Sequence, residues 1–122
     1  MSNQEKNVAV VDDDPEMRAA MASLLSASGY CAETFDSAET FLTCASTSKA
    51  ICLVVAIQLG DISGVELAHQ LAADGFKYPI IFMTGLDDGM IRHQAAAAGG
   101  IAFLHKPFPA STLIDAIKKA VG

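Results

Sequence analysis

Polar side chains that can do chemistry stand at the ends of apolar segments. Asp12 and Asp13 follow "VAVV", Thr84 ends "YPIIFMT", and Lys106 follows "IAFLH". Paired carboxylates hold a hard divalent cation such as Mg²⁺ through oxygen. A lysine and a hydroxyl neutralise and hydrogen-bond phosphoryl oxygens. Together these residue types suit the handling of a phosphoryl group.

The most apolar segment of the chain delivers no such group. "ICLVVAI" ends in Val55, Ala56 and Ile57, so the corresponding position carries only the Ala56 methyl. A methyl cannot attack phosphorus or bind a metal. The set therefore has supporting groups and no nucleophile at its centre.

The elements that position these residues alternate along the chain. Asp14 followed by Pro15 predicts a helix start, and Gly29 suits a left-handed helix end. The repeat of strand and helix predicts a five-stranded parallel sheet with helices on both faces. The carboxyl ends of its strands then lie together at one edge. The predicted strands are 7–11, 30–35, 51–57, 78–84 and 101–105, and the later helices are 38–47, 64–74, 88–98 and 110–121.

The composition of the chain argues against some classes of function. The chain has 122 residues, enough for a single domain over 1–122, and is 52% hydrophobic with a net charge of −6. The charge argues against direct nucleic-acid binding, and no apolar run approaches the roughly 18–20 residues that cross a membrane. The three cysteines match no metal motif, and we expect them to be small apolar fillers in a reducing cytoplasm.

Four motifs in combination resemble one family. "VVDDDP", "LVVAIQLGDISGVEL", "PIIFMTG" and "FLHKPF" are similar to the receiver domains of bacterial two-component response regulators. The resemblance runs from Val8 to about Val121. It implies a cytoplasmic, flavodoxin-like domain with strand order 2-1-3-4-5 that signals through protein contacts and is not an enzyme. The implied partners are a histidine kinase, an output domain or protein, and a second copy docked through 88–98, 101–105 and 110–121.

The resemblance also implies roles for individual residues. Asp12, Asp13 and the backbone carbonyl of Gln58 correspond to the Mg²⁺ ligands. Thr84 and Lys106 correspond to the residues that contact the phosphoryl group. Thr84 and Phe103 correspond to the switch residues, and the bond from Lys106 to Pro107 corresponds to a cis peptide.

Two departures from the family pattern follow. Ala56 stands where the family has its phosphoacceptor aspartate, so we expect no phosphorylation there and weak or absent Mg²⁺ binding. Both an engineered change and natural degeneration account for this alanine. Gly60-Asp61 replaces a common Pro-Gly pair, and we expect a more flexible loop.

Other interpretations stay open on sequence alone. A Mg²⁺-dependent phosphatase or phosphotransferase could use Asp12 as its nucleophile, and a flavin-binding module shares the same fold. Asp61 is interpreted as a loop acid rather than as a substitute phosphoacceptor. The histidines have no metal-site spacing and are expected at the surface.

Overall fold

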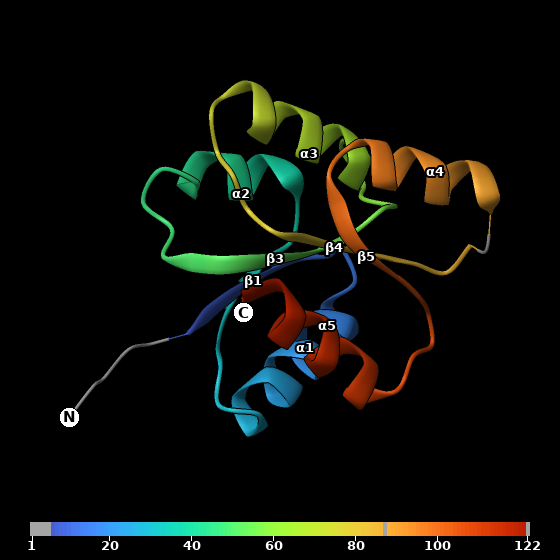
Figure 1. The fold of residues 1–122 in the computed structure, drawn as a ribbon. Helices are drawn as coiled ribbons and strands as arrows, with labels where there is room; N and C mark the ends of the chain where they lie inside the picture. The colour runs from blue at the N-terminus through green and yellow to red at the C-terminus, as the bar shows by residue number, and fades with distance from the viewer. Residues whose placement is uncertain (1–5, 87, 122) are drawn as a thin grey trace.

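The computed structural model describes residues 6–86 and 88–121. Strands and helices alternate as the sequence predicts (Figure 1). The strands are β1 (Asn7–Val11), β2 (Cys31–Phe35), β3 (Ala50–Ala56), β4 (Ile80–Thr84) and β5 (Gly100–His105). The helices are α1 (Pro15–Ala27), α2 (Ala38–Cys44), α3 (Gly64–Ala73), α4 (Gly89–Ala97) and α5 (Ala110–Val121).

The five strands form one parallel sheet in the order β2-β1-β3-β4-β5, which confirms the predicted topology. Helices α1 and α5 cover one face of the sheet, and α2, α3 and α4 cover the other (Figure 1). Because all strands run the same way, the loops after β1, β3, β4 and β5 gather at one edge.

Local signals in the sequence explain the helix ends. The Asp14 side chain accepts a hydrogen bond from the Glu16 N–H at the start of α1, and Ser37 and Ser63 cap α2 and α3 in the same way. Gly29 has φ 91°, the left-handed backbone that favours glycine after a helix. Helix α2 ends at Cys44, three residues before the predicted end at residue 47.

The two faces of the sheet bury separate cores. Phe41, Leu67 and Phe82 pack on the α2–α3–α4 face, and Leu25 and Leu113 pack on the α1–α5 face. Strands β3 and β4 contribute to both cores, which is why they lack alternation in the sequence. This two-sided burial fixes the ends of β3 and β4, where the site residues lie.

The prediction for the cysteines is wrong in part. Cys52 is buried in β3, and burial raises the pKa of its thiol to about 12. Cys31 is exposed, because it starts the edge strand β2, whose residue pattern leaves that side chain outside. Among the described residues, no helix combines the length and apolar character needed to cross a membrane.

Candidate functional site

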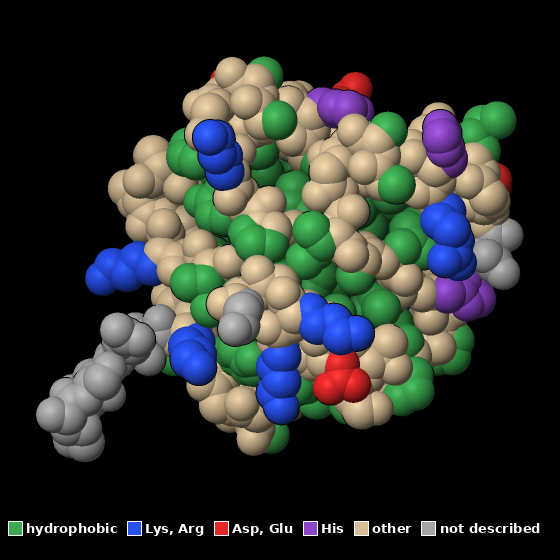
Figure 2. Space-filling view, in the orientation of Figure 1, with side chains coloured by type: hydrophobic (Ala, Val, Ile, Leu, Met, Phe, Trp, Pro, Cys, Tyr) green, Lys and Arg blue, Asp and Glu red, His purple; other side chains and the backbone are tan. Residues whose placement is uncertain are grey.

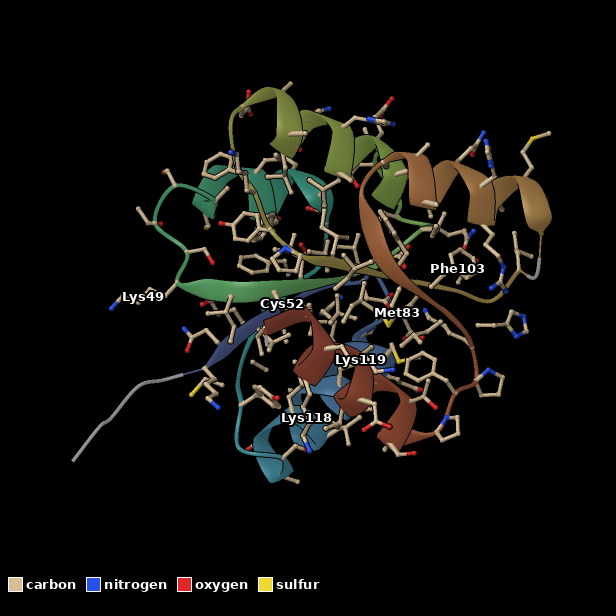
Figure 3. The ribbon with its side chains drawn as sticks, in the orientation of Figure 1. Lys49, Cys52, Met83, Phe103, Lys118 and Lys119 are labelled. Atoms are coloured by element: carbon tan, nitrogen blue, oxygen red, sulfur yellow. The ribbon has the colours of Figure 1, made fainter. Side chains whose placement is uncertain are left out.

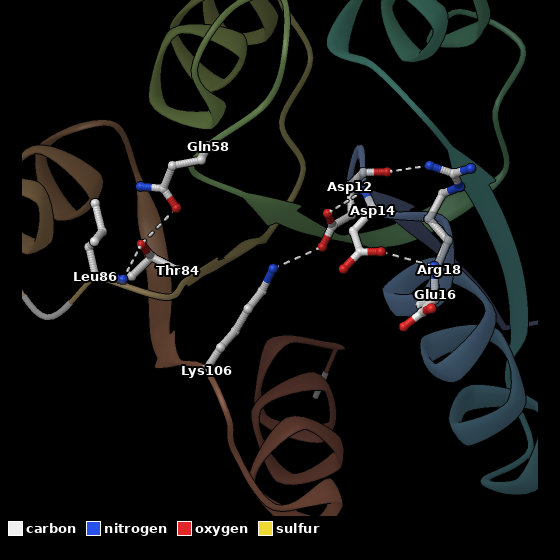
Figure 4. Close-up of polar contacts among 8 residues, drawn as sticks. All are labelled: Asp12, Asp14, Glu16, Arg18, Gln58, Thr84, Leu86 and Lys106. Carbon is white, nitrogen blue, oxygen red and sulfur yellow. Dashed lines mark hydrogen bonds and ion pairs between the residues drawn. The ribbon is translucent and has the colours of Figure 1, made fainter.

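Asp12 is the centre of the polar site at the carboxyl edge of the sheet (Figure 4). Asp12 is only 1% exposed, and its Oδ2 lies 3.0 Å from Lys106 Nζ. Its Oδ1 accepts the Asp14 N–H at 3.0 Å, and its backbone carbonyl accepts from Arg18 Nη1 at 2.8 Å. Asp12 and Lys106 therefore meet as predicted, but they neutralise each other.

Asp13 lies in a different environment from its neighbour. Its side chain is exposed beyond the end of β1. Its Oδ2 lies beside the loop after β3, 3.8 Å from where a Cβ on Gly60 would stand. The acidic pair is thus divided into one buried, paired carboxylate and one exposed carboxylate.

Ala56 ends β3 at the floor of the site. It is 2% exposed and pairs with Met83 on β4. Val55 pairs with Val11 on β1, so the next residues, Ala56 and Asp12, are neighbours across the sheet. The register therefore places Ala56 between the ends of β1 and β4.

The start of α3 is pressed against this floor. A Cβ on Gly64 would stand 2.4 Å from the Ala56 carbonyl oxygen and 2.9 Å from a Val55 methyl. Real side chains do not approach so closely, so the position requires glycine. The Gly64 N–H also donates to the Ile57 carbonyl at 2.8 Å, which holds the helix in place.

Thr84 is fully buried, and its hydroxyl is part of a short relay of hydrogen bonds. The hydroxyl donates to Gln58 Oε1 at 3.0 Å and accepts the Leu86 N–H at 3.0 Å (Figure 4). From the sequence, Gln58 was expected to act only through its backbone carbonyl, and this side-chain contact was not predicted. The only signal was a long polar side chain two residues beyond a buried strand, which names no partner.

Asp61 accepts hydrogen bonds from the start of helix α2. Its carboxylate accepts the Glu39 N–H at 3.0 Å and the Ala38 N–H at 3.4 Å, at the start of α2. The hydrogen bond from the Glu39 backbone, with others from neighbouring N–H groups, holds the pKa of Asp61 below its ordinary value. These bonds restrain the loop that carries Gly60.

The remaining predicted residues lie around the rim. Phe103 is half-buried, and the Arg92 guanidinium lies 4.6 Å from its ring centroid; Figure 3 marks this ring near α4. The Lys106–Pro107 peptide bond is cis, as expected. The three histidines, His69, His93 and His105, are exposed.

The ligand set fits Mg²⁺ poorly. Within 6–86 and 88–121, no group of three or more His, Cys, Asp or Glu side chains is placed to hold a metal ion. Both carboxylate oxygens of Asp12 already have partners, and Ala56 supplies no oxygen from its side chain. Mg²⁺ demands near-octahedral oxygen ligation, so Asp12 would have to release Lys106 before its carboxylate could bind the ion.

Comparison with known proteins decides the family. Residues 8–118 match the response regulator receiver domain, which is most of the chain. The chain belongs to this family. Receiver domains of this kind act in two-component signal transduction and generally bind Mg²⁺ at an acidic phosphorylation site.

Individual relatives support the same assignment. The receiver is 34% identical to the transcriptional regulatory protein TdiR of Thauera aromatica, over 93% of this chain and 50% of that protein. It is 33% identical to the response regulator protein TodT of Pseudomonas putida, over 99% of this chain and 53% of TodT. The receiver thus spans about half the length of these relatives.

A solved structure supports the fold. The crystal structure of FixJ-N superposes with a TM-score of 0.90 at 34% identity, covering 97% of this receiver and 94% of that chain. The five parallel strands and five helices described above are therefore the flavodoxin-like receiver fold, as the sequence predicted.

Proposed function

We propose that this receiver signals through protein–protein contacts without being phosphorylated at the end of β3. The observation that carries the proposal is Ala56, which lies beside Asp12 at the floor of the acidic site. A methyl offers no oxygen to attack a phosphoryl donor. The identity of this position with the family's phosphoacceptor rests on the motif around it, "LVVAIQLGDISGVEL".

The state of the supporting residues agrees with this reading. Lys106 is bound to Asp12 at 3.0 Å and Thr84 is bound to Gln58 at 3.0 Å, so the groups that would hold a phosphoryl group have internal partners. Asp12 is itself buried and fully hydrogen-bonded, which disfavours the alternative of a phosphatase that uses it as nucleophile.

Phosphoryl transfer from acetyl phosphate in Mg²⁺ tests the proposal. We expect the native protein to gain no mass, and Ala56→Asp to gain the mass of one phosphoryl group. Ala56→Asn is the matched control, because it has the size of aspartate without the nucleophilic oxygen. A phosphoryl adduct on the native protein, or none on the aspartate variant, would overturn the assignment of this position.

Weak Mg²⁺ binding is part of the same proposal. With Asp12 held by Lys106 and no third carboxylate, we expect no binding of Mg²⁺ below about micromolar concentrations. Isothermal calorimetry of the native protein measures this directly. A sub-micromolar dissociation constant would show that the acidic residues form a complete metal site.

The face made by α4, β5 and α5 is the surface that we propose for a histidine kinase, an output domain or protein, or a second copy. Met90 is 70% exposed and Ile101 is 51% exposed, and a groove between β5 and α5 is lined by Ile101, Leu104 and Ala116. Figure 2 shows apolar side chains gathered over this part of the surface. Apolar side chains that are exposed together over neighbouring elements are typical of docking sites.

Charge substitution tests the face. We expect Ile101→Glu to reduce any self-association seen by sedimentation or cross-linking, since a charge would be buried at the contact. Thr34→Glu is the control, because Thr34 is an exposed residue of β2 at the opposite edge of the sheet. Equal effects of the two variants would show that the self-association contact does not lie on this face.

A further inference from the structure

The end of β4 and the residue Leu86 just after it are linked to the loop after β3 by hydrogen bonds of side chains. Thr84 ends β4, Leu86 follows it, and α4 begins at Gly89. Gln58 lies in the loop after β3, and its side chain reaches across to Thr84 (Figure 4). This contact joins residues 26 positions apart in the chain.

The chemistry of the groups fixes the direction of this relay. A backbone N–H can only donate a hydrogen bond, so the Leu86 N–H donates to Thr84 Oγ1. The Thr84 hydroxyl has one hydrogen of its own, and it donates this hydrogen bond to Gln58. The acceptor must then be the amide oxygen Oε1, 3.0 Å away, and the amide orientation follows from the hydrogen bonds.

The chain on both sides of Gln58 is held by hydrogen bonds. The Ile57 N–H donates to the Met83 carbonyl at 2.8 Å, which extends the pairing of β3 and β4 to the residue before Gln58. Three residues after Gln58, Asp61 is bound to the start of α2. The loop is held on both sides, so the Gln58 side chain has a defined origin.

Leu86, the last residue of the relay, lies near exposed apolar side chains. Leu86 is 54% exposed and Met90, in the first turn of α4, is 70% exposed. The Leu86 N–H bond holds the backbone of Leu86 to the end of β4. A change in the hydroxyl of Thr84 is therefore expected to act on the position of Leu86.

We propose that Gln58 is a positioning residue whose side-chain oxygen holds the Thr84 hydroxyl and, through it, the backbone N–H of Leu86 in one position. The chain thus supplies its own acceptor for the buried hydroxyl and fixes the backbone just after β4 without any bound group. This role rests on the hydrogen bonds of the native chain, and it holds whether or not residue 56 can be phosphorylated.

Amide hydrogen exchange at Leu86, measured by NMR, tests this role. We expect Thr84→Val to remove the acceptor for the Leu86 N–H and lower its protection by about tenfold or more, and Gln58→Met to lower it by about fivefold, the scale of one hydrogen bond. Thr84→Ser keeps the hydroxyl and should retain most of the protection. Gln70→Met, the same change at an exposed position of α3, should leave it within about twofold.

A double-mutant comparison separates the relay from simple packing. If Gln58 acts through the hydroxyl, Gln58→Met should change Leu86 exchange by less than about twofold in a Thr84→Val background. If it only covers the segment, the fivefold effect should persist there, and the relay is refuted. Native-like protection of Leu86 in Gln58→Met alone would also refute the relay. If Thr84→Val does not fold, the two single variants Gln58→Met and Thr84→Ser are enough to test it.

These measurements use the chain with alanine at position 56, no phosphoryl donor and no metal. Their failure would leave the expected mass results at position 56 unchanged. In the same way, the finding of a phosphoryl adduct would not change the Leu86 exchange expected for the protein without a donor.

Discussion

Two polar networks lie at opposite ends of the sheet, and they are built differently. At the carboxyl end, the buried Asp12 carboxylate is paired with the Lys106 ammonium at 3.0 Å. Near the amino ends of β1 and β3, the half-buried Glu33 carboxylate accepts from Asn7 Nδ2 at 2.7 Å and from Ser48 Oγ at 2.8 Å. One network pairs two charges, and the other satisfies one charge with neutral donors.

The difference concerns what each network joins. Asn7 and Ser48 precede or begin strands, so Glu33 fixes the starts of β1 and β3 against β2. Asp12 and Lys106 follow strands, so their contact joins two loops on which the receiver's site is built. The carboxyl end therefore concentrates buried charge, which is costly to leave unpaired.

The largest effect should come from removing the ammonium at the carboxyl end. Lys106→Met leaves the Asp12 carboxylate buried without its charge partner, and we expect a loss of about 2–3 kcal/mol in the free energy of unfolding. Urea unfolding at neutral pH measures it. Lys49→Met, at an exposed lysine far from the site (Figure 3), should change stability by less than about 0.5 kcal/mol. Similar losses in both variants would mean that the pair contributes nothing particular.

Adding a charge to the same end should cost less. Ala56→Asp places a third carboxylate beside Asp12 and Asp13, and like charges disfavour joint ionisation. We expect a loss of about 1–2 kcal/mol without metal, because Lys106 offsets part of the repulsion. The loss should shrink in Mg²⁺, which binds only the folded state.

Denaturant unfolding of Ala56→Asp and Ala56→Asn, with and without Mg²⁺, separates charge from size. The asparagine variant should show no recovery with Mg²⁺. A metal-free aspartate variant more stable than the native protein would contradict the electrostatic account of the carboxyl end.

The amino end should respond more weakly. Glu33→Gln replaces one carboxylate oxygen by an NH₂ group and breaks one of the two hydrogen bonds from Asn7 and Ser48. We expect a loss of about 1 kcal/mol in unfolding free energy. Asp115→Asn on α5 provides the exposed acid-to-amide control. A loss as large as that of Lys106→Met would remove the distinction between the two ends.

The smallest effect concerns the pH dependence contributed by Asp61. Its pKa in the folded protein lies below the ordinary value of 3.8, mainly because of the Glu39 N–H. The carboxylate therefore stabilises the folded state above its unfolded pKa, and this contribution is lost as pH falls through the folded pKa. The side chain is exposed, so solvent screens the gain.

Asp61→Asn should remove that small contribution. The stability difference between native protein and variant should be present at pH 7 and should shrink below about pH 4. Thermal unfolding across this range measures it, with Asp74→Asn at the exposed end of α3 as the control. A gap that grows on acidification would show that Asp61 gains its partners in the protonated form.

The sequence predicted the fold because its signals are local. Asp14, Ser37 and Ser63 each cap the helix that directly follows them, and unbroken apolar runs identify the strands buried on both faces. The motifs at the strand ends then placed Asp12, Thr84 and Lys106 together. The strand order followed from the resemblance to a known family.

The partners of the polar side chains could not be predicted. Gln58 meets Thr84 and Asp61 meets Glu39 across more than twenty positions of sequence, and only the packed loops bring them together. The exposure of Cys31 was missed although the expected strand order already placed its strand at the edge, because cysteine was treated as an apolar residue wherever it stood.

The glycine at position 64 sets how closely α3 can begin beside β3. A Cβ at this position would stand 2.4 Å from the Ala56 carbonyl oxygen, so only glycine lets the helix start this near the end of the strand. The short loop between the two elements also carries Asp61, which accepts the Glu39 N–H at the start of α2. The tight junction of β3 with α3 and the anchoring of α2 therefore depend on the same few residues of the chain.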